Sequence, residues 1–216
     1  MLERQETKER ILEAAEKLFS DEGLSKTSLR AITLAAGVNV AAVHYHFGSK
    51  LALVRELFAR RVEPINAERL RRLSEIEAAH PAGVLPLEPI IESFVEPVLA
   101  VMGGVDGARR NLGQLVGRFY GEPDSVLEPF LREQFGEVAR RFNVGLARAL
   151  PELPRPEVAW RLQFIVAVLT HVVLAGHHAL DIVPEYPLSN GDETQMRARL
   201  VAFLAAGCRS AVQERS

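Results

Sequence analysis

Apolar side chains recur every three or four residues along most of this chain, which is the spacing that places them on one face of an α-helix. The longest such stripe consists of Leu127, Leu131, Phe135, Val138, Phe142, Leu146 and Leu150. Clusters of proline, glycine and polar residues separate further predicted helices at residues 7–20, 49–73, 87–102, 109–120, 157–180 and 195–213. No strand pattern or internal repeat stands out, so the sequence predicts an all-α fold.

A short helix is predicted to start at Thr27 or Ser28, either of which can accept a hydrogen bond from the free N–H groups of the first turn. Its apolar residues lie at positions i, i+3 and i+7 and form one buried stripe. These residues are Leu29, Ile32 and Ala36. Gly37 follows, where a helix C-terminus favours a residue that tolerates positive φ, so the helix is expected to end in a tight turn.

A second short helix is predicted at residues 40–47, directly after Asn39, which can cap it. Val43 and Phe47 lie four residues apart and anchor this helix to the core. Its other side chains, which face outward or sideways, are Val40, Ala41, Ala42, His44, Tyr45 and His46. A helix of this length is marginal in water, so packing must hold it. Two helices joined by a short glycine-containing turn form a helix-turn-helix motif, whose second helix can enter a DNA groove.

The net charge of −2 is unevenly distributed along the chain. Residues 24–62 contain six basic side chains and a single acidic one, Glu56, and all four lysines lie within the first fifty residues. A basic face on an acidic body is what phosphate binding requires, whereas chance clustering on a solvated surface is the alternative. The coincidence of this basic window with the motif favours nucleic-acid binding.

Together these segments resemble the DNA-binding domain of the TetR family of bacterial transcription regulators. The resemblance rests on the start of the motif at residues 27–32, the turn at 35–38 and the end at 43–50. It extends back through residues 4–23, which are similar to the first helix of the family, and covers residues 4–62 in all.

The resemblance implies two domains. Residues 1–50 form the helix-turn-helix DNA-binding domain, and residues 51–216 form an effector-binding and dimerisation domain. A long connecting helix at residues 49–73 is expected to join them. We expect a kink or break near Val62, because Pro64 removes a backbone donor and clashes with the preceding turn.

Several polar side chains of the motif suit contacts with the DNA backbone. Tyr45 and His46 end the second helix and can donate to phosphate oxygens, and Lys50 can place its ammonium on a phosphate. The hydroxyls of Thr27 and Ser28 can do the same at the N-terminus of the first helix. These five residues are the predicted phosphate contacts.

The resemblance implies that Arg30 reads a base in the major groove, where arginine can bond a guanine through two N–H groups. The family's base-facing positions correspond here to Val40, Ala41, Ala42 and His44. The family often has Gly-Thr-Leu-Tyr where this chain has Ala-Ala-Val-His from position 41, so direct reading is expected to depend mainly on Arg30 and His44. Packing or capping within the domain is the alternative for His44 and His46. The predicted DNA-binding set is Thr27, Ser28, Arg30, Asn39, Val40, Ala41, Ala42, His44, Tyr45, His46 and Lys50.

The helix predicted at residues 157–180 bears on the oligomeric state. Between residues 162 and 176 it is apolar nearly all round, so it must be covered on every side. The last helix carries apolar residues on one side, namely Leu200, Phe203, Leu204 and Cys208. The resemblance implies a homodimer with a four-helix interface, which suits a palindromic DNA site. The alternative is a central helix in a monomeric bundle.

The resemblance also implies a small-molecule effector in a mostly apolar pocket of the second domain. The side chains that could line this pocket are Phe94, Val98, Met102, Leu115, Phe119, Phe130, Trp160, Phe164 and His171. Ordinary core packing is the alternative for each of them. His171 and His178 share a helical face, but they lie two turns apart, about 10 Å, which is too far for one metal ion. No metal or cofactor is therefore predicted.

Other features restrict the class of protein. The single cysteine, Cys208, excludes a disulfide within the chain and fits a reducing cytoplasm. The N-terminus shows no signal peptide, and the longest apolar stretch, 162–176, is shorter than the ~20 residues that cross a bilayer. No nucleophile motif, phosphate loop or metal-ligand spacing indicates an enzyme.

We therefore predict a cytoplasmic, homodimeric DNA-binding repressor that a small apolar effector releases from a palindromic operator. Its expected partners are double-stranded DNA, a second copy of the chain and the effector. A helical interaction module that does not bind DNA is the alternative, and a helical-bundle enzyme is a less favoured one.

Overall fold

The computed structural model describes residues 2–24, 26–102, 127–175 and 193–212. All regular elements within these ranges are α-helices, which confirms the all-α prediction. The helices are α1 (Leu2–Glu22), α2 (Leu29–Ala36), α3 (Val40–Phe47), α4 (Lys50–Ala79), α5 (Leu87–Met102), α7 (Leu127–Ala149), α8 (Arg155–Ala175) and α9 (Glu193–Cys208). The helix predicted at residues 109–120 lies outside the described residues.

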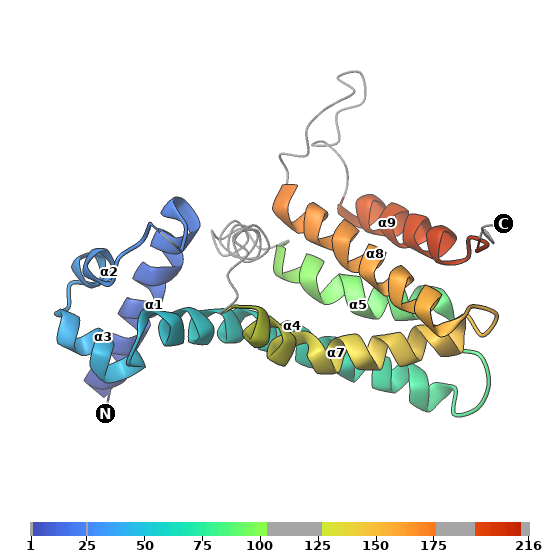
Figure 1. Cartoon of the computed structure of the whole chain (residues 1–216), viewed down its shortest axis with the longest axis horizontal. Coiled ribbons are helices and arrows are strands. Elements are labelled where there is room, and N and C mark those ends of the chain that lie inside the picture. The colour runs from blue at the N-terminus through green and yellow to red at the C-terminus, as the bar shows by residue number, and fades with distance from the viewer. Residues whose placement is uncertain (1, 25, 103–126, 176–192, 213–216) are drawn as a thin grey trace, which may run out of the picture.

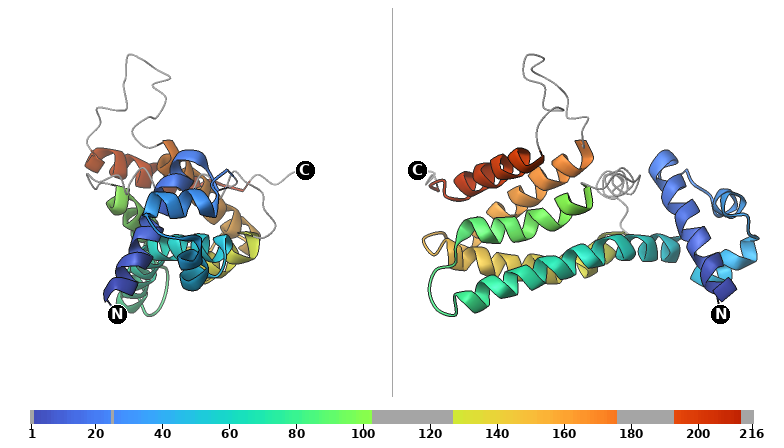
Figure 2. Two further views of the ribbon diagram at one scale, coloured as in Figure 1. Left: turned by 90° about the vertical axis from the view of Figure 1, so that its left-hand side faces the viewer. Right: turned by 180° about the vertical axis from the view of Figure 1, so that it is seen from behind.

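The helices form two packing units that share α4: a small body, made of α1, α2, α3 and the first turns of α4, and a larger bundle. Figure 1 shows α1, α2 and α3 gathered around the first turns of α4, while the rest of α4 lies in a larger bundle with α5, α7, α8 and α9. The view from behind in Figure 2 shows the same separation, with α4 as the continuous connection between the small body and the bundle. The arrangement places α2 and α3 at the outer end of the molecule.

The small body has its own hydrophobic core, which extends beyond the motif. Phe19 of α1, Ile32 of α2 and Val43 of α3 are fully buried in it. Its further members on α4 continue as far as Val62. The boundary that the sequence suggests at residue 50 therefore marks the end of the motif, whereas the packing unit includes the first three turns of α4.

Helix α4 continues through Pro64 and ends at Ala79, so the expected break is absent and the predicted end at residue 73 was too early. Val62 is buried in the core of the small body and Ile65 in the core of the bundle, while the Pro64 side chain is exposed. Packing on both sides of the proline thus holds the helix despite the missing hydrogen bond.

The first turns of α7 join the two bodies. Phe130 is buried in the small body's core, where its ring lies edge-on to that of Phe58, with centroids 5.3 Å apart. Phe135, one turn further along α7, also meets Phe58 edge-on at 5.9 Å. Later members of the same apolar stripe, such as Phe142 and Leu146, are buried in the bundle core. One amphipathic helix therefore contributes to both cores.

Candidate nucleic-acid interface and ligand cavity

Local hydrogen bonds shape the helix-turn-helix motif. Ser28 caps α2 by accepting a hydrogen bond from the Ala31 N–H at 3.1 Å, and Asn39 caps α3 by accepting one from the Ala42 N–H at 2.9 Å. Gly37 ends α2 in the left-handed conformation, with φ of 63°, which glycine adopts without steric cost. The capping roles predicted for Ser28, Gly37 and Asn39 are confirmed.

An arginine of α1 holds the turn between α2 and α3. The Arg10 guanidinium donates to the carbonyl of Ala36, and at 3.1 Å to that of Gly37. A Cβ added at Gly37 would lie 2.8 Å from the Arg10 Nη2. The angle between the two helices of the motif thus depends on both residues.

Replacing Gly37 with alanine is expected to destabilise the small body by about 1–2 kcal/mol, because an L side chain is strained in the left-handed region. The contact with Arg10 adds to this cost, since the guanidinium must move away from the turn. Urea unfolding of Gly37→Ala, Arg10→Ala and the double variant separates the two terms. Simple additivity of the three free-energy changes would show that the Arg10 guanidinium adds nothing to the cost of the substitution at Gly37.

Helix α3 is fixed by its apolar face and presents its polar face to solvent. Val43 and Phe47 are buried, as predicted. The exposed residues on the helix are Val40, Ala41, His44 and Tyr45, whereas Ala42 and His46 are half-buried. His44 also closes the C-terminus of the helix, because its Nδ1 lies 3.1 Å from the Gly48 carbonyl oxygen. The capping alternative considered for His44 is therefore realised in this structure.

Two predicted phosphate contacts face inward. Thr27 is only 1% exposed, and its hydroxyl bonds the Gly23 carbonyl at 2.8 Å, so it closes the loop between α1 and α2. The Lys50 ammonium donates to the Leu24 carbonyl and is half-buried. The expectation of an outward Thr27 hydroxyl was wrong, because a buried hydroxyl must find its partner within the protein. Lys50 ties the start of α4 to the same loop.

Ion pairs offset some of the positive charge of the basic window at residues 24–62. Arg60 pairs with Glu9, and Arg61 makes two hydrogen bonds to the Glu16 carboxylate at 2.9 and 2.7 Å. These pairs join α4 to α1 and neutralise part of the basic window. Arg30, by contrast, is exposed on α2.

Sequence reasoning missed a basic residue beside α3. The exposed Arg4 of α1 places its guanidinium carbon 4.9 Å from the centroid of the Tyr45 ring. Lys26 is also exposed, in the loop before α2. Arg4 lies before the helix predicted at residues 7–20 and within the segment 4–23 that resembles the first helix of the family, but only the fold shows that this end of α1 lies next to α3.

The larger bundle contains a cavity of about 330 Å³ between α4, α5, α7 and α8. Its lining is formed by Val62, Ile65, Arg69, Phe94, Val98, Leu131, Phe135, Val138, Ala139, Leu162, Gln163, Val166, Leu169, Thr170 and Val173. This volume is at the lower end of the range for small-molecule sites, and the mostly apolar lining is typical of them.

Two of the predicted pocket residues, Phe94 and Val98, line this cavity. Phe130 instead packs in the core of the small body. The remaining described candidates, which are exposed on the outside of α8, are Trp160, Phe164 and His171. These four residues do not line the cavity, because the helical face that each occupies points elsewhere. Leu115, Phe119 and the side chain of Met102 lie outside the described part of the chain.

A helix-turn-helix body with an exposed second helix, carried on a larger helical bundle, defines a helix-turn-helix DNA-binding regulator. Residues 11–57 match the family model described as bacterial regulatory proteins, tetR family. Residues 92–207 match the model described as tetracyclin repressor-like, C-terminal domain. The chain belongs to the TetR family of bacterial transcription regulators.

Individual relatives agree with this assignment. The probable HTH-type transcriptional regulator ArpR of Pseudomonas putida is 40% identical over 154 residues, which cover 71% of this chain and 68% of that protein. The regulator TtgR, also of Pseudomonas putida, is 30% identical over the same extent. The regulator AcrR of Shigella flexneri is 46% identical over 56 residues, which are 26% of each protein.

Solved structures share the whole fold. NalD, the secondary repressor of the MexAB-OprM multidrug efflux pump in Pseudomonas aeruginosa, aligns with a TM-score of 0.63 and 23% identity, covering 96% of this chain and 98% of that one. A transcriptional regulator from Aquifex aeolicus VF5 aligns with a TM-score of 0.59 and 20% identity, covering 93% and 98%. The chain is a DNA-binding transcription regulator.

Proposed function

We propose that this regulator acts in the cytoplasm as a homodimeric repressor of a palindromic operator, and that a small molecule in the bundle cavity releases it. The observation that carries the proposal is the coexistence of an exposed α3 at one end of the molecule with an apolar cavity in the bundle. Helix α4 and the first turns of α7 connect the two sites.

An exposed apolar face on α8 and α9 supports the homodimer. Trp160 and Phe164 are 56% and 52% exposed on α8, and Phe203 is 70% exposed on α9. Only 33% of the apolar span 155–173 is buried within one chain. Exposed aromatic side chains on neighbouring helices such as α8 and α9 are typical of a protein interface. A second copy, with its α8 and α9 packed against this face, covers them.

One side of α9 is buried within the chain and does not belong to the proposed interface. Leu200, Leu204 and Cys208, which the sequence grouped with Phe203, are buried in the bundle core. Burial raises the pKa of the Cys208 thiol, which disfavours the reactive thiolate. The proposed interface therefore uses the Phe203 side of α9 and needs no disulfide between the two copies.

For DNA, we propose that α3 enters the major groove and that basic residues around it hold the phosphates. The exposed residues Arg30, His44 and Tyr45 are placed for this role, together with Arg4 and Lys26. A dimer places two such helices one turn of DNA apart, about 34 Å, so its operator is an inverted repeat. Selection from random duplexes tests this: a palindromic consensus supports the proposal, and a single half-site overturns the dimeric reading.

Arg30→Ala is expected to weaken operator binding by about 10- to 100-fold and to relax the preference at one base pair, because a bidentate contact to guanine is lost. Arg4→Ala is expected to weaken binding to all duplexes alike and to reduce the slope of log K against log salt by about one. Titrations of a fluorescent operator at several salt concentrations measure both effects. Arg140→Ala, exposed on α7 in the bundle, is the control and should change neither.

A further inference from the structure

The first turn of α3 presents short apolar side chains. Val40 is 41% exposed, Ala41 is exposed and Ala42 is half-buried. Valine and alanine side chains carry no hydrogen-bond donor or acceptor, so they cannot read a base by hydrogen bonds. We propose that this end of α3 instead recognises the C5-methyl groups of thymines in the major groove, and that Val40 contacts them. This inference rests on the proposed function, since it names the chemical group that α3 reads in its operator.

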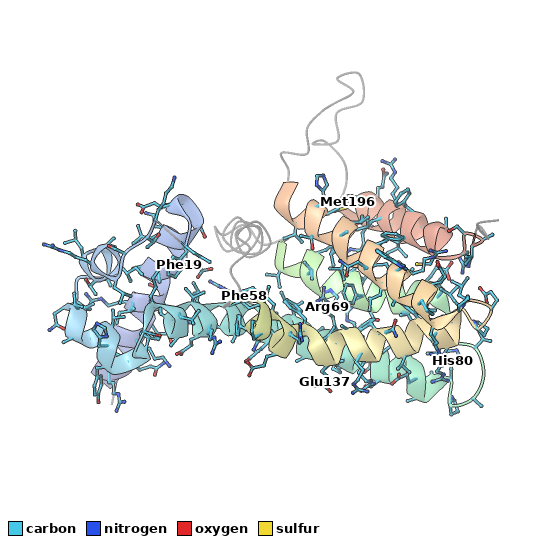
Figure 3. The ribbon with its side chains drawn as sticks, viewed as in Figure 1. Phe19, Phe58, Arg69, His80, Glu137 and Met196 are labelled. Carbon is cyan, nitrogen blue, oxygen red and sulfur yellow. The ribbon has the colours of Figure 1, made fainter. Side chains whose placement is uncertain are left out.

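The fold places Val40 where base edges lie in a complex with DNA. Figure 3 shows α3 at the opposite end of the molecule from His80, which follows the last turn of α4. Val40 is the first residue of α3, and the N-terminal residues of the second helix of a helix-turn-helix motif contact the base edges. Val43 and Phe47 are buried and anchor the helix in the core of the small body. Val40 can therefore meet a base while the helix stays packed.

The polar residues on either side of this turn are engaged within the motif. The Asn39 Oδ1 accepts the Ala42 N–H at 2.9 Å, so the amide cannot present its oxygen and nitrogen together to an adenine, which is how asparagine reads that base. The His44 Nδ1 lies 3.1 Å from the Gly48 carbonyl oxygen. Because a carbonyl oxygen only accepts, Nδ1 donates in this bond, and one ring nitrogen of His44 is left for DNA. Neither residue can make a two-point contact with a base edge.

Thymine is the base that suits such a surface. Its major-groove edge carries a methyl group, whereas cytosine presents an amino group and no methyl group. Burial of one methyl group against Val40 favours binding by about fourfold. The short side chains of Ala41 and Ala42 let this end of the helix approach the bases closely. A polar base edge buried against the same side chains loses water without gaining a hydrogen bond, which disfavours binding.

Substituted operators test the methyl contact in the unmodified protein. Selection from random duplexes supplies the operator, and deoxyuridine then replaces each thymidine in turn, in both half-sites together. Deoxyuridine pairs with adenine as thymidine does and lacks only the C5-methyl group. At the contacted position the affinity should fall by at least about tenfold, because a methyl contact is lost in each half-site. With cytosine and its guanine partner at that position, 5-methylcytosine should restore at least about threefold of the affinity, because it returns the methyl group.

A variant assigns the contact to Val40. Val40→Ala should weaken binding to the thymidine operator and leave binding to the deoxyuridine operator nearly unchanged, so that the two affinities differ by less than about twofold. Val144→Ala is the matched control, because Val144 is 44% exposed on α7, in the bundle. It should preserve the full difference between the two operators. Circular dichroism confirms that both variants are folded, and the deoxyuridine series does not depend on either of them.

The outcomes separate this inference from the proposed function. If selection enriches no duplex, the proposed reading of DNA by α3 fails and the methyl contact fails with it. If an operator is selected but no deoxyuridine substitution changes its affinity, operator binding stands and the methyl contact is overturned. A thymidine preference that persists in Val40→Ala would come from the shape of the DNA or from another residue, and it would overturn the role of Val40.

Discussion

A chain that carries Phe164→Glu together with Phe203→Glu is expected to be monomeric and to lose at least about 100-fold in operator affinity. Both side chains lie more than half exposed on the proposed interface of α8 and α9. Glutamates at these positions would bring four like charges together and bury them without partners in the dimer. A monomer also loses the gain that arises when one molecule contacts two half-sites at once.

Sedimentation and operator titration measure these two effects on the same samples. The double variant Val84→Glu/Val144→Glu is the matched control, because it makes the same change of charge at exposed apolar residues that belong to neither α8 nor α9. Trp160 gives an independent signal: it is the chain's single tryptophan, so its emission should shift to shorter wavelength on dimerisation. A double variant that still sediments as a dimer would place the interface elsewhere.

The motif could be read from the sequence because its determinants are local. The caps at Ser28 and Asn39, the left-handed Gly37 and the buried pair Val43 and Phe47 all act within a few residues of one another. Their patterns are therefore visible in a single stretch of chain.

Side-chain roles that depend on partners far away in the sequence could not be predicted from the sequence alone. Lys50 meets the Leu24 carbonyl and Arg10 holds Ala36, each across 26 positions. Thr27 has the right type for a phosphate contact, yet its hydroxyl is enclosed by the loop that precedes it. The same residue types serve capping, loop closure and DNA binding, so only the fold distinguishes these roles.

The pocket was the least predictable part for a related reason. Aromatic residues occur equally in cores, cavities and interfaces, and the sequence alone does not say which helical face meets which neighbour. Phe94 lines the cavity, whereas Phe164 lies outside it and Phe130 packs in the other body. Arg69, on a helix rich in arginine and glutamate, resembles a solvated surface charge until α5 is seen to cover it.

Removing the Phe130 side chain is expected to have a large effect on the coupling between the small body and the bundle. The residue is 2% exposed and meets Phe58 edge-on at 5.3 Å, while the Arg55 guanidinium lies 5.5 Å from its ring centroid. Truncation to alanine should cost about 3–5 kcal/mol through lost burial and the cavity left behind. The neighbouring Leu131 and Phe135 line the cavity of the bundle, so the first turns of α7 contact both this cavity and the small body's core.

Calorimetric unfolding tests whether Phe130 couples the small body to the bundle or only adds to the stability of one core. Phe130→Ala should split the unfolding of the chain into two transitions, because the bodies then share less of their cores. Ile91→Ala, fully buried in the bundle core and absent from the cavity lining, should lower the stability while the bodies still unfold together. Coupling between two sites requires one shared element whose conformation both sites affect. If the small body and the bundle unfold independently, α7 no longer acts as such an element between the cavity and α3. A single transition for Phe130→Ala, with no greater loss than for Ile91→Ala, would show that Phe130 does not couple the two bodies.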